Sequence, residues 1–246
     1  MEPPLFNRPH HQRIAQVLLS LDADLLRQNH CLFGGGTAIA LRFGEFRESV
    51  DIDFLVSDLP GYRLLRQLMT GEKGINTIVR VGVIPLVQTR ELRADQYGIR
   101  TQVQVDGQPI KFEIVLEGRI QFAPPTLADT VCGVAILTPL DMATSKLLAN
   151  SDRWGDEGVF NRDVIDLGAM KLPLPLLRQA VVKAEQAYGP SIIRDLAKAV
   201  DRLQHRQGWL ERCMAAMAIH QPKAVVWKQV RVLRRVLPKT SAQAAA

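Results

Sequence analysis

The spacing of apolar residues divides the chain into a mixed N-terminal part and a helical C-terminal part. Apolar residues that recur at helical spacing predict helices over residues 8–29 and 60–71. Short apolar or alternating segments predict strands over residues 31–33, 51–56, 99–105 and 109–116, and a strand pair over residues 77–88. Asp106-Gly107 separates the last two single strands, which indicates a β-hairpin.

From Pro139 onward almost every apolar pattern is helical. The predicted helices cover residues 139–150, 174–188, 190–207, 209–220 and 222–236, with a further helix that begins near Arg162. Prolines stand near several of the predicted helix starts, where this residue is tolerated. We therefore expect an α+β protein with a mixed-sheet domain over residues 1–135 and a helical domain over residues 136–246.

Composition is that of an ordinary globular protein. Of the 246 residues, 47% are hydrophobic and 23% are charged. No apolar run reaches the roughly 18–20 residues of a membrane-spanning helix, and the N-terminus lacks the apolar core of a signal peptide. Cys31, Cys132 and Cys213 show no metal-binding spacing. We expect reduced thiols, a cytoplasmic location and no membrane partner.

Positive charge is concentrated near the C-terminus. The whole chain carries +6, and the segment 202–239 contains nine Lys/Arg against one acidic residue, Glu211, for a local balance of +8. This asymmetry favours an anionic polymer as substrate or partner. The alternative is a solvated helical surface without a partner.

The segment 34–56 holds the residues with the clearest chemistry. Asp51 and Asp53 occupy positions i and i+2 of an apolar strand, so their Cβ atoms share one face at roughly 6–7 Å. Aspartate is rare in strands, and Mg²⁺ is typically bound by one or two carboxylates together with substrate phosphates. Gly35 and Gly36 precede a helix, and a glycine turn with a helix N-terminus suits a phosphate. These are the parts of a phosphoryl- or nucleotidyl-transfer site.

Neighbouring polar residues are candidates for supporting roles. Thr37 is expected to cap the helix through its hydroxyl, and Ser49 shares the face of the two aspartates, where it could bind metal or orient Asp51. Arg42 and Arg47 could each reach a phosphate or pair with a nearby glutamate. The histidines at positions 10, 11 and 30 lack ligand companions, so we expect surface histidines.

The same segment resembles a known family. Gly35-Gly36-Thr37-Ala38, followed by Arg47-Glu48-Ser49-Val50-Asp51-Ile52-Asp53-Phe54, is similar to the G-G-T-A and R-x-S-x-D-I-D-F motifs of the AbiEii/AbiGii toxins. That family belongs to the polymerase β-like nucleotidyltransferases, and some members are toxins of type IV toxin–antitoxin and phage-defence systems. The resemblance implies a polymerase β-like core followed by helices, and a cognate antitoxin as partner.

The resemblance also implies roles for residues outside this segment. Glu113 stands where such folds carry a third metal-binding carboxylate, although an ion pair with Lys111 on an exposed sheet face is the alternative. Lys146 would contact a triphosphate, and Asp163 would support the site or its lysine. The residues that fit the family pattern here are Lys146, Arg153, Arg162, Asp163 and Asp166. Surface helices with ordinary ion pairs are the alternative.

Together these features predict a nucleotidyltransferase that uses Mg²⁺, with Mn²⁺ as a possible substitute, and an NTP as substrate. It would transfer a nucleoside monophosphate to a hydroxyl and release pyrophosphate, and the acceptor would be RNA, such as the 3′ end of a tRNA. Asp51, Asp53 and Glu113 would bind the metal. Two alternatives stay open: transfer to a protein or small molecule, and a non-catalytic module that binds nucleic acid or a protein partner.

Overall fold

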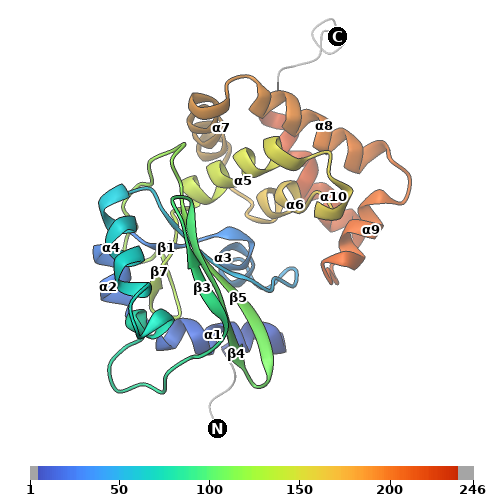
Figure 1. Ribbon diagram of the computed structural model, residues 1–246. Coiled ribbons are helices and arrows are strands. Elements are labelled where there is room, and N and C mark those ends of the chain that lie inside the picture. The colour runs from blue at the N-terminus through green and yellow to red at the C-terminus, as the bar shows by residue number, and fades with distance from the viewer. Residues whose placement is uncertain (1–4, 238–246) are drawn as a thin grey trace, which may run out of the picture. The chain divides into compact units, whose positions relative to one another are not determined.

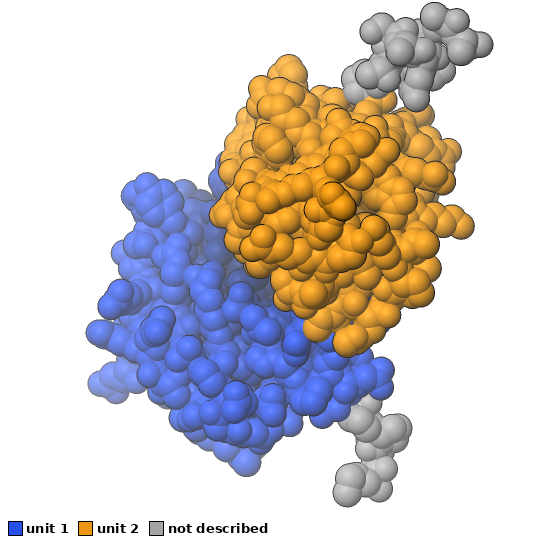
Figure 2. All heavy atoms as spheres, turned by 90° about the vertical axis from the view of Figure 1, so that its right-hand side faces the viewer, with its two compact units in different colours: residues 1–138 blue, residues 139–246 orange. Residues whose placement is uncertain are grey.

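The computed structural model describes residues 5–237, and these residues form two compact units. Unit 1 ends at Thr138 and unit 2 begins at Pro139, as coloured in Figure 2. The boundary expected from the sequence lay at residues 135–136. Within the described residues, no helix is both long and apolar enough to cross a membrane.

Unit 1 combines helices with a mixed five-stranded sheet (Figure 1). Its helices are α1 (Pro9–Ser20), α2 (Ala23–Gln28), α3 (Gly35–Arg42), α4 (Leu59–Met69) and the 3₁₀ helix η1 (Gly74–Ile78). The sheet strands are β1 (Leu32–Phe33), β2 (Ile52–Val56), β3 (Val87–Ala94), β4 (Gly98–Val105) and β5 (Gln108–Leu116). A separate two-stranded hairpin contains β6 (Thr130–Val131) and β7 (Val134–Ala135). The predicted α+β class is confirmed.

The strand order is β1-β2-β5-β4-β3, and only β2 and β5 run parallel. Along β2 and β5 the side chains alternate between a fully buried face and a partly exposed face. Phe33, Phe54 and Phe112 from three adjacent strands form a row of tilted aromatic contacts on the buried face. Because side chains alternate on a strand, this packing turns Asp53 and Glu113 to the opposite face.

Two of the predicted elements are wrong. The helix expected over residues 8–29 breaks at Leu21, because Leu21 forms a bridge with Val79 and Asp22 caps α2 by accepting a hydrogen bond from the Leu25 N–H. The strand pair expected over residues 77–88 is replaced by the end of η1 and a loop, with β3 beginning only at Val87. β3 is an exposed edge strand of mostly polar residues, so it lacks the apolar alternation that marks a half-buried strand.

Unit 2 is helical, as predicted, with α5 packed against three other helices. The α-helices are α5 (Pro139–Arg153), α6 (Arg162–Ala169), α7 (Leu174–Tyr188), α8 (Ser191–His205), α9 (Trp209–Ala216) and α10 (Lys223–Val232). Two 3₁₀ helices, η2 (Glu157–Val159) and η3 (Leu233–Val236), complete the described part. Lys239, the last residue of the basic segment, lies outside the described residues.

Candidate active site

Two carboxylates of unit 1 occupy the partly exposed face of the sheet, and a third lies beside its second strand. Asp53 on β2 pairs in register with Glu113 on the parallel neighbour β5, so the two side chains lie side by side. Asp51 directly precedes β2, two positions before Asp53. The sheet therefore places two of the three predicted metal ligands, Asp53 and Glu113, on neighbouring strands, while Asp51 lies just before β2.

The glycine turn packs against Asp53. Gly35 opens α3 with φ +66°, in the left-handed region that favours glycine, and a Cβ there would lie only 2.5 Å from Asp53 Oδ2. The Gly34 N–H donates to the Asp53 carbonyl over 2.8 Å. The first turn of a helix has backbone N–H groups without intrahelical partners and a positive dipole end. A helix N-terminus of the kind that suits an anion thus lies beside the Asp53 carboxylate.

Thr37 has a different role from the expected helix cap. It lies inside the first turn of α3, whose N-cap is Gly34, and no side-chain cap is formed. Instead its hydroxyl donates to the Asp51 carbonyl and lies 2.8 Å from Ser49 Oγ. Thr37 and Ser49 therefore fix the segment that leads into Asp51, which fits the orienting role that was one of the two options for Ser49.

His11 is a supporting residue that the sequence interpretation missed. It is completely buried rather than on the surface, so the prediction of a surface histidine is wrong here. Its Nε2 accepts a hydrogen bond from the Ser49 N–H, and its Nδ1 lies 2.8 Å from Glu45. Nδ1 must then carry the proton, and burial lowers the pKa of His11. The only sequence signal was its position on the apolar face of α1, beside Ile14 and Ala15.

The two candidate arginines are held differently. Arg47 is buried, donates to the Glu48 carbonyl, and its Nη2 would lie 2.1 Å from a Cβ at Gly36. Its guanidinium therefore packs against the first turn of α3, next to the predicted phosphate position. Arg42 instead pairs with Asp129 over 3.1 Å.

Glu113 takes part in ion pairs. Lys111 Nζ lies 2.7 Å from one carboxylate oxygen and Arg100 Nε lies 3.3 Å from the other. Within residues 5–237 no three His, Cys, Asp or Glu side chains are gathered as a metal-binding group. The oxygen-only donor set and the close fit of Gly35 against Asp53 suit Mg²⁺ chemically. Glu113 must exchange its cationic partners before it can join such a site.

The predicted site residues of unit 2 form a buried ionic network. Lys146 on α5 lies 3.0 Å from Asp163 and 2.7 Å from Asp166, both on α6. Arg153 at the end of α5 donates to both oxygens of Asp163 over 2.8 and 2.9 Å. Lys146, Asp163 and Asp166 are all buried, so the alternative of surface ion pairs is wrong. Asp163 is ion-paired with Lys146, while the supporting role of Asp163 and the triphosphate contact of Lys146 stay predictions.

Charge balance determines the ionisation of this network. Burial alone would raise the pKa of Asp163, but the Lys146 ammonium and the Arg153 guanidinium hold that pKa well below its ordinary value. The hydrogen bonds to Asp163 raise the pKa of Arg153 in turn. Asp163 and Arg153 thus form a charged pair in the helical unit.

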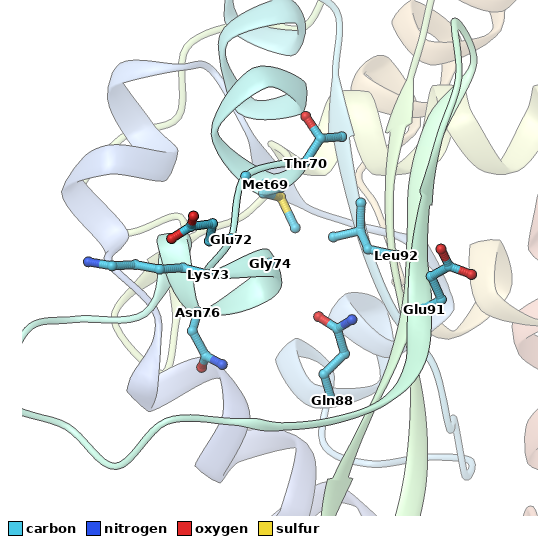
Figure 3. Close-up of a pocket in the computed structure, with 10 residues that line it drawn as sticks. Met69, Thr70, Glu72, Lys73, Gly74, Asn76, Gln88, Glu91 and Leu92 are labelled. Carbon is cyan, nitrogen blue, oxygen red and sulfur yellow. The ribbon is translucent and has the colours of Figure 1, made fainter.

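A polar cavity of about 450 Å³ lies elsewhere in unit 1, beside η1 and β3 (Figure 3). Glu72, Lys73 and Glu91 line it, and the Asn76 side chain there exchanges two hydrogen bonds with the Leu86 backbone. None of the predicted site residues lines this cavity. It is therefore not part of the glycine–carboxylate site.

Comparisons with known proteins find a matching family model and two similar solved structures. The family model described as "Nucleotidyl transferase AbiEii toxin, Type IV TA system" matches residues 17–229. No curated protein is significantly similar in sequence. Among solved structures, JHP933 from Helicobacter pylori is 13% identical, with 98% of each chain covered and a TM-score of 0.51. A presumed nucleotidyltransferase from H. pylori is 12% identical, with 92% of this chain and 94% of that chain covered and a TM-score of 0.49.

The match to the family model spans both units and includes every predicted site residue, from the glycine turn to Asp163. The likeness to JHP933 supports the fold alone at this level of identity. Membership implies an antitoxin as protein partner. The chain belongs to the AbiEii family of nucleotidyltransferase toxins of type IV toxin–antitoxin systems.

Proposed function

We propose that this protein transfers a nucleoside monophosphate from an NTP to a hydroxyl group of RNA, with the 3′ end of a tRNA as the expected acceptor. The observation that carries the proposal is the register of Asp53 with Glu113 beside the N-terminal turn of α3. This arrangement supports the proposal, because a helix N-terminus, which suits a phosphate, then lies close to a carboxylate that could hold a metal. A role in phage defence is part of the same proposal and rests on the family.

In this proposal, one set of residues in unit 1 binds the triphosphate and another set binds the metal. The N–H groups of Gly35 and Gly36 at the α3 N-terminus would hold the triphosphate, and Arg47 against Gly36 would add positive charge. Asp51, Asp53 and Glu113 would hold Mg²⁺. Bound Mg²⁺ supplies charge neutralisation on the phosphates and lowers the pKa of the acceptor hydroxyl.

The reaction exchanges one phosphoester bond for another. The acceptor oxygen bonds to the α-phosphorus, and the bond from this phosphorus to the oxygen that bridges it to the β-phosphate breaks. Pyrophosphate leaves, and the proton of the acceptor hydroxyl passes to water. The helix N-terminus stabilises the negative charge that develops on the phosphates, because its dipole is already oriented before the reaction.

The test is transfer of label from each of the four α-labelled NTPs to total bacterial RNA and to total protein, with Mg²⁺. Asp53→Asn should lower transfer by about 10²–10³-fold, the range seen when one stabilising group is removed from an active site. Asp24→Asn, an exposed carboxylate on α2, is the matched control and should transfer normally. Full activity of Asp53→Asn would refute the proposed site, and label in protein would refute the RNA acceptor.

A further inference from the structure

Five cationic side chains form a line on α8 and α9 of the helical unit. Arg194, Lys198 and Arg202 follow at four-residue intervals on α8, Arg206 stands at its C-terminal cap, and Arg212 lies on α9. Residues four apart on a helix are neighbours, with Cβ atoms about 5–6 Å apart. We refer to these five residues as the basic ridge. α8 leads directly into α9 (Figure 1).

Aromatic rings hold the central guanidinium groups of the ridge in place. Trp209 is buried and stacks on Phe160, with ring centroids 6.2 Å apart. Arg202, Arg206 and Arg212 lie 4.7, 4.6 and 5.5 Å from the centre of the Trp209 ring. Such cation–π contacts restrain long side chains that would otherwise sample many rotamers. The ridge is therefore preorganised before any ligand binds.

The ridge residues differ in their freedom to bind a ligand. Arg202 is 14% exposed and donates to the carbonyls of Trp154 and Gly155, so it is part of the framework. Arg206 and Arg212 are 42% and 61% exposed. Both can present N–H groups to a molecule outside the helical unit.

Within residues 5–237, only two carboxylates lie within 4.0 Å of the five cations of the ridge. Glu157 lies within 4.0 Å of the guanidinium groups of Arg202, Arg206 and Arg212. Asp195 pairs with Arg194 and lies 3.6 Å from Lys198. Five cations against these two carboxylates leave a charge of +3. Glu157 is itself half exposed, so an incoming anion can replace it.

We propose that the basic ridge binds the phosphodiester backbone of an RNA strand, with phosphate groups taking the place of the Glu157 carboxylate on Arg206 and Arg212. Guanidinium groups bind phosphate oxygens in bidentate fashion, and a row of cations at regular spacing fits a polymer with one charge per unit. Backbone contacts carry no base specificity, so this surface binds RNA irrespective of sequence. The inference rests on the proposed function only in taking RNA as the acceptor.

The direct test is the affinity for a fluorescent single-stranded RNA, measured by anisotropy over a series of salt concentrations. Arg206→Gln/Arg212→Gln should reduce the salt slope by about 1.4, because each phosphate contact on a single strand contributes about 0.7. At 0.1 M salt this corresponds to about 25-fold weaker binding. The matched control is Arg231→Gln/Arg235→Gln, which removes the same charge from exposed positions on α10 and η3.

A second variant keeps the test decisive if the double variant fails to fold. Glu157→Gln removes the competing carboxylate and should bind RNA more tightly than wild type. Unchanged or weaker binding by Glu157→Gln would overturn the exchange of Glu157 for phosphate. Equal losses in the ridge and control variants would overturn the inference, because net charge alone would then explain binding.

Two further comparisons separate this inference from its alternatives. If the ridge variant binds RNA normally but loses affinity for poly-glutamate, the surface serves an acidic protein and the inference is wrong. Asp53→Asn should lower nucleotide transfer by about 10²–10³-fold yet bind RNA like wild type, since Asp53 lies in unit 1. Loss of transfer and loss of RNA binding therefore report on the active site and on the ridge separately.

Discussion

Asp163 is the acceptor that two cations of the helical unit share, so Asp163→Asn tests whether this network stabilises the unit. The carboxylate accepts hydrogen bonds from Lys146 and Arg153 through both oxygens. Asparagine has nearly the same shape but no charge, and its NH₂ group would face an N–H donor of Arg153 or Lys146. The substitution thus removes the charge without creating a cavity.

The expected loss is about 3 kcal/mol. Removing one partner of a buried ion pair typically costs about 3–5 kcal/mol, because the remaining charge is left buried and uncompensated. The lower end applies here, since Asp166 still pairs with Lys146 over 2.7 Å and Arg153 is 34% exposed. With a urea dependence of about 1–3 kcal/mol per molar, the unfolding midpoint should fall by about 1–3 M.

Tryptophan fluorescence is the appropriate probe for this measurement. All three tryptophans of the chain, Trp154, Trp209 and Trp227, lie in the helical unit, so their emission reports on unfolding of that unit. Asp152→Asn, an exposed carboxylate next to Arg153, is the matched control and should change the free energy of unfolding by less than about 0.5 kcal/mol.

The pH dependence provides an independent check. The cations hold the pKa of Asp163 below its ordinary value of about 3.9, so the unfolded chain takes up this proton first as the pH falls. The stabilisation is complete above pH 4 and is lost as the pH drops toward the lower pKa of the folded state. The difference between wild type and Asp163→Asn should therefore shrink below pH 4. Equal stability of the two proteins at pH 7 would refute the reasoning.

Three further predictions concern unit 1. Gly35→Ala should weaken the binding of a non-hydrolysable NTP by at least tenfold in calorimetry. The reason is that residue 35 has a positive φ and that a Cβ there would collide with Asp53. Wild-type affinity of this variant would show that the turn does not contact phosphate. In NMR spectra His11 should titrate below its ordinary pKa of about 6.5, and His11→Gln identifies its signal. Because the unfolded chain then binds this proton more readily than the folded unit, the unit should lose stability as the pH falls below 6.5. An ordinary or raised pKa of His11 would contradict this prediction. Lys111→Met should tighten Mg²⁺ binding up to about fivefold in the same calorimetry, because Glu113 no longer has to give up its ion pair with Lys111. An exposed ion pair of this kind contributes at most about 1 kcal/mol. Weaker Mg²⁺ binding would mean that Lys111 assists the metal.

Sequence patterns predicted the helices and strands in which buried apolar residues recur at regular spacing. They missed the features that depend on contacts with residues far away in the sequence. The hairpin of β4 and β5 follows from its alternation and the turn at Asp106-Gly107. The break at Leu21 depends on its bridge to Val79, 58 positions along the chain, and an amphipathic pattern continues across it unchanged. The edge strand β3 is held by backbone hydrogen bonds, which almost any residue except proline can make, so the side-chain pattern does not reveal it.

The same distinction explains what could be predicted of the candidate site. Asp51 and Asp53 share a face because of strand geometry alone, and this needed no structure. The pairing of Asp53 with Glu113 requires a parallel contact between strands some 60 residues apart, which only the family resemblance indicated. The burial of His11 was not predicted, because a buried histidine can be recognised only from its hydrogen-bond partners. One of these partners, Ser49, lies 38 residues away in the sequence.

The two ionic clusters of the helical unit differ in a way that indicates their roles. Lys146 and Arg153 are matched by two buried carboxylates, since an uncompensated charge in the interior would cost several kcal/mol. The basic ridge lies at the surface, where water screens excess charge, and its +3 is tolerated without a partner. Salt should therefore separate the two clusters. Raising the salt concentration from 0.1 to 0.5 M should weaken RNA binding through the ridge steeply. The contribution of Asp163 to the free energy of unfolding should stay nearly unchanged, because buried ion pairs are screened much less than exposed ones.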